Sequence, residues 1–559
     1  MFYCPGMAFN LADLVEHTVD VVPDRTALIC GAQQRTFREL EERANRLAHH
    51  LAKQGVGRND HVAVLSYNSL EYVETMLAAF KLRAVPINVN FRYVEDELVY
   101  LLDNSDSVAV VHQAQFSPLV DAVRPRLPQL RHALVVDDGS GTAPGAGSRP
   151  YEEALAAASP ERDFPPRSDD DIYILYTGGT TGSPKGVVWR HEDVWRTLGG
   201  GIDFLTGERI EDEHQLSRLA AATEPGVGLV PAPLMHGAAQ WGTLGGLMKG
   251  ITSVLLPHFD ADAVWQSIET YRIATLAITG DAMARPLIDA LRAHPYDTSS
   301  LVAISSTAAV FSPVVKDQLF ELLPDLFISE AVGSSESGFN GMRLVDKANT
   351  TMATGGLINV DRGPDTIVID DQNRPVAPGE VGRMARGGNV PLEYYKDPEK
   401  SAATFITIDG KRYSVPGDFA RLELDGTMTL LGRGSQSINS GGEKIYPEEV
   451  ESALKAHPSV FDALVVGVPD ERWGQRVAAI IEPRAGAAPT LDELADHCRT
   501  KVARYKVPRQ LHLVDAMPRH PSGKPDYRRA KAIAEGHLAD PATDPGFADP
   551  AAPAEETEA

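Results

Sequence analysis

The first hundred residues alternate between two hydrophobic spacings, one typical of strands and the other typical of amphipathic helices. Apolar residues recur every third or fourth position across 37–51, and a capping box of Thr36 and Glu39 precedes them, which predicts a helix. The other helices expected here are 72–80 and 95–102, and the expected strands are 27–30, 62–65, 85–89 and 108–111. Alternation of this kind predicts an α/β fold with a largely parallel sheet.

The middle of the chain continues the same pattern. The apolar run 172–176, IYILY, has the β-branched and aromatic content of a buried strand. Residues 208–224 are charged and weakly patterned, and we interpret them as a surface excursion. Beyond them the expected strands are 227–231, 253–256, 276–279 and 302–305, and the expected helices are 263–271 and 283–293.

The hydrophobic pattern changes near residue 365. Short strand-like stretches at 365–370, 382–385 and 421–431, separated by turns, indicate a β-rich subdomain. Residues 432–435, GRGS, form a polar break, and a compact α+β unit follows. We therefore expect a large N-terminal domain of α/β sheets at 1–432, a small C-terminal α+β domain at 433–534, and a disordered acidic tail at 535–559.

The loop after the buried strand carries the first candidate chemistry. Residues 177–186, TGGTTGSPKG, offer backbone N–H groups, hydroxyls and one ammonium, which are the groups that surround a phosphate chain. The common nucleotide loop needs Ser or Thr directly after its lysine, but Gly186 follows Lys185 here. The loop alone is equally compatible with a phosphate cradle and with a surface turn.

Composition narrows the class of protein. The 559 residues are 43% hydrophobic and 23% charged, as in an ordinary globular protein, and the net charge of -24 argues against a nucleic-acid partner. Three distant cysteines, Cys4, Cys30 and Cys498, favour a reducing compartment over a disulfide framework. No stretch has the length of a membrane helix, and the N-terminus lacks the pattern of a signal peptide, so we expect a cytoplasmic protein.

Five motifs, taken together and in order, resemble the adenylate-forming superfamily of acyl-CoA synthetases, amino-acid adenylation domains and luciferases. They are the loop 177–186, GSSE at 333–336, YSVPGD at 413–418, GR at 432–433 with SGGEKIYP at 440–447, and PSGK at 521–524. Within the superfamily, runs at 187–196, 279–287 and 432–451 look closest to actinobacterial CoA ligases that act on fatty acids and steroid side chains.

The resemblance implies a role for each motif in joining a carboxylate to AMP. Glu336 would hold Mg²⁺, Asp418 would accept hydrogen bonds from the ribose hydroxyls, and Arg433 would reach the ribose or a phosphate. Lys524, carried by the small domain, would bridge the carboxylate and the α-phosphate. The residues that would bind ATP phosphates are Thr177, Gly178, Gly179, Thr180, Thr181, Gly182, Ser183, Lys185 and Ser335. Lys524, Glu336 and Thr181 are the expected catalytic residues.

The resemblance also implies that the small domain is mobile and rotates between two reactions. In the second pose Ser440, Gly441, Gly442 and Lys444 would approach the thiol of CoA, the expected acyl acceptor. Ser435 and Gln436 occupy the hinge positions where the family usually has a lysine and an acidic residue. Val332 occupies a position where the family often has a tyrosine beside adenine, so stacking on adenine by this residue is in question.

The acyl pocket is expected near 235–241, 305–310 and 330–332, with His236 and Ala308 in its wall. His236 does not suit an ammonium group, and the small residues after it leave room for a bulky apolar acid. A structural role for His236 is equally compatible. The leading hypothesis is an acid–thiol ligase for a medium-chain, long-chain or steroid side-chain acid that uses ATP, Mg²⁺ and CoA. A fatty acyl-AMP ligase that loads a carrier protein is the alternative, and a homodimer is compatible with either.

Overall fold

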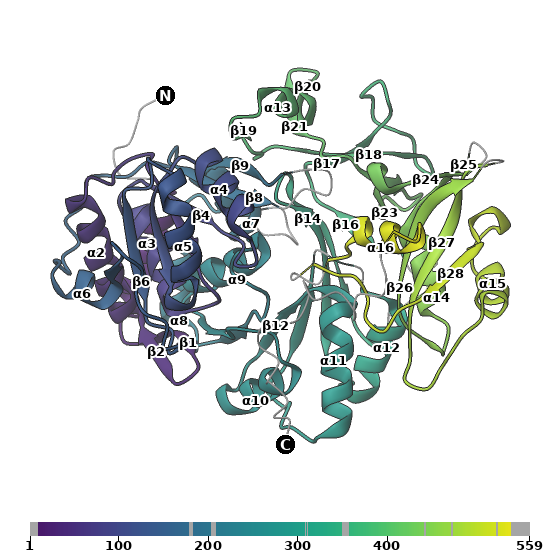
Figure 1. Ribbon diagram of the computed structural model, residues 1–559, viewed down its shortest axis with the longest axis horizontal. Coiled ribbons are helices and arrows are strands. Elements are labelled where there is room, and N and C mark those ends of the chain that lie inside the picture. Colours follow the sequence, from purple (N-terminus) through teal and green to yellow (C-terminus); the bar gives the residue numbers. More distant parts are fainter. Residues whose placement is uncertain are drawn as a thin grey trace.

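The strands and helices are described in a computed structural model that covers residues 9–177, 183–202, 208–307, 309, 311–348, 357–440, 443–470, 473–520 and 524–537. Figure 1 shows the N-terminal half at one end, the C-terminal sheet at the other end, and a long sheet that links them. The expected α/β class, with a β-rich part and a small α+β part, is confirmed. The tail from residue 538 onward lies outside the described residues.

A parallel sheet of order β4-β3-β5-β6-β7 forms the first layer. Its strands are β3 (His61–Leu65), β4 (Val85–Asn88), β5 (Ser107–Gln113), β6 (His132–Val136) and β7 (Arg149–Pro150). The helices of this part are α2 (Phe37–Lys53), α3 (Leu70–Lys81), α4 (Glu95–Asn104), α5 (Ser117–Val123) and α6 (Tyr151–Ala156). The capping box of Thr36 and Glu39 begins α2 as expected, and the apolar face of α2 is buried.

The second sheet is longer and runs β2-β1-β11-β10-β12-β13-β14-β15-β16-β23-β22-β18-β21-β20, with β17 paired to β18. Its first strands are β1 (Thr26–Cys30), β2 (Gln33–Thr36), β10 (Val227–Leu229), β11 (Thr252–Leu255), β12 (Thr275–Ile278), β13 (Ala303–Ser306), β14 (Phe327–Ser334) and β15 (Gly338–Val345). Strand β1 pairs in parallel with β11, more than 200 residues away in sequence, and not with β3. Sequence proximity therefore does not decide which sheet a strand joins.

The helices of this middle part are α7 (His191–Leu198), α8 (Gln215–Ala222), α9 (Gly237–Met248), α10 (Ala261–Tyr271), α11 (Gly280–Ala293) and α12 (Pro313–Leu322). Helix α8 corrects the expectation of an unpatterned excursion at 208–224. Its apolar side is short, because only Leu216, Ser217 and Ala220 are buried, so the charged flanks hide the pattern. Helix α1 (Leu11–Val21), against which α8 packs, was also not anticipated.

The β-rich part comprises β16 (Asn359–Arg362), β17 (Thr366–Ile369), β18 (Val381–Gly387), β20 (Phe405–Ile408), β21 (Lys411–Ser414), β22 (Asp418–Leu422) and β23 (Met428–Arg433), with helix α13 (Pro398–Thr404). The stretch 421–431, where a turn at Asp425-Gly426 was expected, contains parts of two strands joined by a turn at Gly426. The polar break is also ordered: Gly432 and Arg433 end β23, and a 3-10 helix spans Gly434–Gln436.

The C-terminal part contains a sheet of order β25-β24-β27-β26, with β28 paired to β27. Its strands are β24 (Ile438–Ser440), β25 (Glu443–Ile445), β26 (Val460–Asp470), β27 (Gly474–Pro483) and β28 (Gln510–Leu513). Its helices are α14 (Pro447–Lys455), α15 (Leu491–Arg499) and α16 (Tyr527–Ala534). Apolar residues on both faces of β26 and β27 pack into two separate clusters, so this part has cores of its own.

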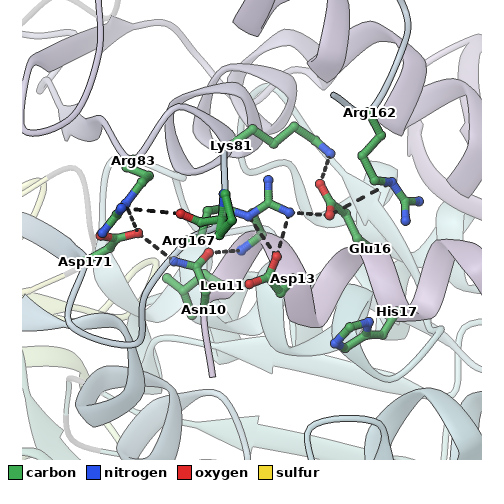
Figure 2. Close-up of polar contacts among 12 residues, drawn as sticks. Asn10, Leu11, Asp13, Glu16, His17, Lys81, Arg83, Arg162, Arg167 and Asp171 are labelled. Carbon is green, nitrogen blue, oxygen red and sulfur yellow. Dashed lines mark hydrogen bonds and ion pairs between the residues drawn. The ribbon is translucent and has the colours of Figure 1, made fainter. Parts of the chain in front are cut away.

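A third sheet, β19-β9-β8, carries the candidate loop: β8 (Ile172–Thr177) pairs with β9 (Lys185–Arg190), and β19 is Glu393–Tyr394. Figure 2 shows a buried polar network at the start of β8. Asp171 accepts hydrogen bonds from Arg83 Nη2 at 2.7 Å and from Asn10 Nδ2 at 3.0 Å. Because Asp171 directly precedes Ile172, this network anchors the strand that leads to the loop.

Candidate functional site

The two ends of the signature loop are held by strands β8 and β9. Thr177 and Lys185 are cross-strand partners, so the intervening residues form a loop that leaves and re-enters the same sheet. Tyr100 donates a hydrogen bond from its hydroxyl to the Pro184 carbonyl at 3.2 Å, and Ser183 is exposed. The expected phosphate-binding residues Gly178, Gly179, Thr180, Thr181 and Gly182 lie outside the described residues.

Lys185 contacts the β-rich part of the molecule. Its ammonium forms an ion pair with Asp397 and lies 5.9 Å from the ring centroid of Tyr394. The Lys185 charge and a backbone N–H hold the pKa of Asp397 below its usual range. Asp397 and Tyr394 were not identified from sequence, because they lie more than 200 residues from the loop that they contact.

Asn88 is a further residue that sequence reasoning missed. This buried side chain accepts a hydrogen bond from the Tyr176 N–H at 2.8 Å and donates to the Tyr176 carbonyl at 2.8 Å. It also donates to the Met235 carbonyl at 2.7 Å. One amide thus joins the end of β8 to the residue before His236, which connects the expected phosphate loop to the expected acyl pocket.

We expect the substitution Asn88→Ala to lower the stability of the protein by about 2–3 kcal/mol, because it leaves a buried N–H and two buried carbonyls without partners. Thermal unfolding should show a lower midpoint than in the parent chain. Asn90→Ala is the matched control, since Asn90 accepts only a local bond from the Arg92 N–H, at 3.0 Å. Equal effects of the two substitutions would contradict the bridging role.

Glu336 lies in the turn between β14 and β15, and three side chains from other elements hold that turn. Tyr394 donates its hydroxyl to Glu336 Oε1 at 3.1 Å, and Ser414 donates to the Glu336 carbonyl at 2.6 Å. Trp189 donates its indole N–H to the Ser335 carbonyl at 3.0 Å. The Glu336 carboxylate is half-buried, and only part of its hydrogen-bonding capacity is used by Tyr394.

A carboxylate placed in this way suits Mg²⁺, which takes one or two protein carboxylates and completes its shell with water and phosphate oxygens. Glu336 does not belong to a cluster of several protein ligands. In the described part of the chain, the one such group combines His17, Glu213 and His214, on α1 and just before α8.

Asp418 and Arg433 face each other across strands β22 and β23. They are cross-strand partners, and Arg433 Nε donates to Asp418 Oδ1 at 3.1 Å. Burial raises the pKa of Asp418, and the Arg433 charge opposes that rise. Burial also acts to lower the pKa of Arg433, but the charges of Asp418 and Glu336 outweigh it and raise that pKa overall. These two distant motifs therefore form one charged site with Glu336.

Lys524 joins this site from the C-terminal part. Its side chain remains accessible to solvent, yet enclosure by the surrounding protein, followed by repulsion from Arg433, lowers its pKa. Attraction to Glu336 and Asp418 acts in the opposite direction. The structure therefore brings Lys524 within electrostatic reach of Glu336, Asp418 and Arg433, although 91 residues separate it from Arg433.

His236 lies directly before helix α9. Burial lowers its pKa to about 3, and the Lys524 charge contributes to that shift. Its Nε2 is buried and makes no hydrogen bond with the described residues. His236 is therefore neutral at pH 7 and lies within electrostatic reach of Lys524. Ala308, the other expected wall residue, lies outside the described residues.

Val332 does not take the place of an adenine-stacking residue. It is buried and packs with Val360, Met384 and Met428 in the core of the β-rich part. A branched apolar side chain at this position stabilises the junction of β14 with that core, so the Val332 side chain is committed to packing.

Comparison with known proteins assigns the family. The chain matches the family of AMP-binding enzymes over residues 15–395, and it matches the AMP-binding enzyme C-terminal domain over residues 449–524. This chain belongs to the AMP-binding enzymes. The family assignment covers both parts of the molecule that meet at Lys524.

Relatives of this AMP-binding enzyme support the assignment along nearly the whole chain. It is 54% identical to a 3-oxocholest-4-en-26-oate–CoA ligase of Rhodococcus rhodochrous, over 94% of this chain and 96% of that protein. It is also 54% identical to a medium/long-chain-fatty-acid–CoA/3-oxocholest-4-en-26-oate–CoA ligase of Mycolicibacterium smegmatis, over 96% of this chain and 98% of the relative.

A solved structure has the same fold. The crystal structure of the anthranilate–CoA ligase AuaEII in complex with anthranoyl-AMP aligns with a TM-score of 0.82 at 23% identity, and covers 95% of this chain and 98% of that chain. No helix among the described residues of the AMP-binding enzyme has the length and apolar character needed to cross a membrane.

Of the expected CoA-binding residues, Ser440 is described in full, and it lies in β24, next to the edge strand β25 of the C-terminal sheet. Ser440 ends β24 and pairs with Glu443 in β25 and with Gly474 in β27. Figure 1 shows β24 and β25 well separated from α11, on the other side of the C-terminal part. Gly441, Gly442 and the side chain of Lys444 lie outside the described residues.

The expected hinge of the AMP-binding enzyme contains a close contact. Gly432 has φ +106°, and a Cβ there would lie 2.2 Å from the carboxylate of Glu448 on α14, so only glycine fits. Burial, and then the charge of Glu451, raises the pKa of Glu448 to about 8. Asp418 raises this pKa further and Arg433 opposes the rise. The first helix of the C-terminal part thus packs directly on the end of β23.

This contact predicts a dependence of stability on pH. The pKa of Glu448 is about 8 in the folded chain, against an ordinary value of 4.5. The folded chain therefore holds more protons between these values, and Glu448 contributes stability that is complete below pH 4.5 and lost as the pH rises through about 8. We expect Glu448→Gln to have a higher thermal midpoint than the parent chain at pH 8, with the difference shrinking toward pH 5.

The matched control for this prediction is Glu449→Gln on the same helix. Glu449 is paired with Lys506 at 2.6 Å, so its loss should lower the midpoint by a similar amount at every pH in this range. A difference between parent and Glu448→Gln that does not vary from pH 5 to pH 8 would refute the role assigned to burial of Glu448.

Proposed function

We propose that this AMP-binding enzyme is an ATP-dependent acyl-CoA synthetase for hydrophobic carboxylic acids, namely medium- or long-chain fatty acids or steroid side-chain acids. The observation that carries the proposal is the convergence of Lys524, from the C-terminal part, with Glu336, Asp418 and Arg433. Lys524 and Arg433 are cations that would reduce the repulsion between ATP and the substrate carboxylate. Glu336 and Asp418 are carboxylates that would bind a metal ion and the ribose hydroxyls.

In the first step an oxygen of the substrate carboxylate attacks the α-phosphorus of ATP. A bond forms between that oxygen and phosphorus, the bond to the β-phosphate oxygen breaks, and pyrophosphate leaves with the electron pair. The carboxylate is already ionised, so no general base is required. Lys524 would lie between the two anions, lower their repulsion and align the attack. Mg²⁺ held by Glu336 would neutralise phosphate charge.

The other expected site residues have parts in the same step. Asp418 would accept hydrogen bonds from the ribose hydroxyls, and the Arg433 charge favours the ionised form of its carboxylate. The loop residues Thr177–Lys185 and Ser335 would bind the outer phosphates. In the second step the thiol of CoA attacks the acyl carbonyl and AMP leaves, and Ser440, Gly441, Gly442 and Lys444 would line the path of that thiol.

The side chains on one face of the large sheet are compatible with an apolar acyl substrate. Ala277, Ser305 and Ser329 are aligned across the parallel strands β12, β13 and β14, and their shared face is partly open. The opposite face, with Leu276, Ile304 and Ile328, is fully buried in the main core. At the start of β14 on the open face, Phe327 is exposed by 48%. Small and apolar side chains on one face leave room for a long hydrophobic substrate.

The relatives named above act on acids of this kind, and their extent of identity supports the same substrate class here. A division into 1–432, 433–534 and 535–559, with the second unit mobile, is part of this proposal. The cytoplasmic location and the homodimer remain predictions.

The test is an assay with ATP, Mg²⁺, CoA and a panel of acids: octanoate, palmitate, a 3-oxo-steroid side-chain acid, benzoate and an amino acid. We expect pyrophosphate release and thioester formation with the first three. A panel in which none of the acids releases pyrophosphate would contradict the proposal. Accumulation of acyl-AMP with CoA left unused would instead identify an acyl-AMP ligase.

A further inference from the structure

The described structure places Lys524 in one particular pose, and a charged contact on helix α11 accompanies that pose. Asp281 and Arg285 lie in the first turns of α11, four residues apart, and expose only 1% and 3% of their surfaces. Buried charges are costly unless other charged or polar groups compensate them. Asp281 and Arg285 pair with each other at 3.6 Å, and further compensating groups come from the C-terminal part of the molecule.

The carboxylate of Asp281 faces Lys455, the last residue of α14, at 3.9 Å. The guanidinium of Arg285 lies over the ring of Phe461 in β26, with its Cζ 5.4 Å from the ring centroid. One acidic and one basic residue of α11 thus each meet a complementary group across the junction. Ser312 holds the other oxygen of Asp281 through its backbone N–H at 2.8 Å, so the carboxylate has a fixed direction.

These contacts continue toward Lys524. Lys455 also pairs with Asp462 Oδ1 at 3.1 Å, and Arg519 donates to Asp462 Oδ2 through Nη2 at 2.6 Å and Nε at 2.9 Å. Lys455 and Arg519 hold the pKa of Asp462 well below its usual range, with a smaller effect from Arg285. A carboxylate that is this fully paired is a rigid attachment point.

Arg519 lies at the base of the segment that carries Lys524. It forms a β-bridge with Pro525, and the His520 N–H donates to the Lys524 carbonyl at 2.7 Å. The Asp526 N–H closes the base through a bond to the Pro518 carbonyl at 3.0 Å. A continuous set of contacts therefore leads from α11, through Asp462 and Arg519, to the backbone of Lys524.

We infer that Asp281 and Arg285 form an interdomain latch, defined by these two residues with Lys455 and Phe461, that stabilises the pose in which Lys524 reaches the adenylation site. Asp281 and Arg285 are positioning residues and act through Lys524. The inference rests on the proposed function and adds to it a contact between α11 and the C-terminal part. It predicts that the latch favours acyl-AMP formation and contributes nothing to transfer of the acyl group to CoA.

The kinetic test compares the two half-reactions in Asp281→Asn. This variant keeps the acceptor for the Ser312 N–H and removes only the charge. We expect about a tenfold loss of kcat for acyl-AMP formation from palmitate and ATP, typical of one lost coupling, with little change in KM. Thioester formation from supplied palmitoyl-AMP and CoA should stay at the parental rate, which also shows that the variant is folded. Equal losses in both half-reactions, or no loss, would overturn the latch.

A double substitution sharpens the assignment. If the latch acts only through Lys524, Asp281→Asn should have no further effect on acyl-AMP formation in a Lys524→Ala chain. An additional tenfold loss in that background would mean that Asp281 acts by another route. Asp297→Asn is the control, because Asp297 pairs with Arg272 at 2.6 Å on the exposed surface of the large domain. It should leave both half-reactions unchanged.

A measurement without catalysis separates the latch from the proposed function. Lys455→Gln lies in the C-terminal part, and amide hydrogen exchange is read on the other side of the junction, in the first turns of α11. We expect exchange there to become faster than in the parent chain. Unchanged exchange would refute the latch even in an active enzyme, whereas faster exchange in a chain inactive toward every acid would contradict only the proposed function.

Discussion

Lys524→Ala should reduce acyl-AMP formation by about a thousandfold, while thioester formation from supplied acyl-AMP remains close to the parental rate. Lys524 lies within electrostatic reach of Glu336, Asp418 and Arg433, and under the proposed function its removal would leave two reacting anions without a charge between them. Pyrophosphate release with palmitate and ATP measures the first half-reaction, and CoA thioester formation from palmitoyl-AMP measures the second.

The unequal effect on the two half-reactions is the distinguishing feature of this prediction. A folding defect would reduce both, whereas loss of an adenylation residue reduces only the first. Lys531→Ala is the matched control, since Lys531 lies on α16 in the same part of the chain and pairs with Glu535 at 3.9 Å on the surface. Parallel loss of both half-reactions in Lys524→Ala would disprove the assigned role.

Glu336→Gln should lower the rate of acyl-AMP formation by about a hundredfold and raise the Mg²⁺ concentration needed for half-maximal rate. The amide keeps an acceptor for the Tyr394 hydroxyl, which lies 3.1 Å from Glu336 Oε1, so the turn is preserved while the charge is lost. A neutral oxygen binds a hard divalent cation less well than a carboxylate does. Initial rates across a Mg²⁺ titration measure both effects.

Glu393→Gln is the control for charge alone, because Glu393 is an exposed residue of β19 beside Tyr394. Its Mg²⁺ dependence should match that of the parent chain. A Glu336→Gln enzyme with reduced rate but unchanged Mg²⁺ dependence would assign Glu336 a structural role through Tyr394 and Ser414, and would remove it from the metal site.

The local sequence pattern predicted those helices and strands that are marked by a short motif, such as a capping box or a run of apolar residues. Helix α2 begins at its capping box, and β3, β5, β10 and β12 lie where short apolar runs predicted strands. Helix α8 was missed because its buried face is too short to dominate a charged segment. The polar break expected at 432–435 overlaps the end of β23, which runs to Arg433, and Gly432 there allows a close approach to Glu448.

The site residues divide in the same way. Glu336, Asp418, Arg433 and Lys524 were named from motifs, since each motif is a few adjacent residues. Asn88, Tyr394 and Asp397 were not, because nothing in their neighbouring sequence distinguishes them from ordinary polar residues. Their importance comes from contacts with Tyr176, Glu336 and Lys185, which are between 58 and 212 residues away.

The sequence by itself determined the family and the α/β class, and it marked the charged residues that we propose for the reaction, because those follow from short motifs and from hydrophobic spacing. Only the tertiary structure decided that β1 joins β11, that Val332 belongs to a core, and that α11 meets the C-terminal part through Asp281 and Arg285. The physical reason is that a pairing between distant segments depends on the geometry of both partners, which neither segment encodes alone.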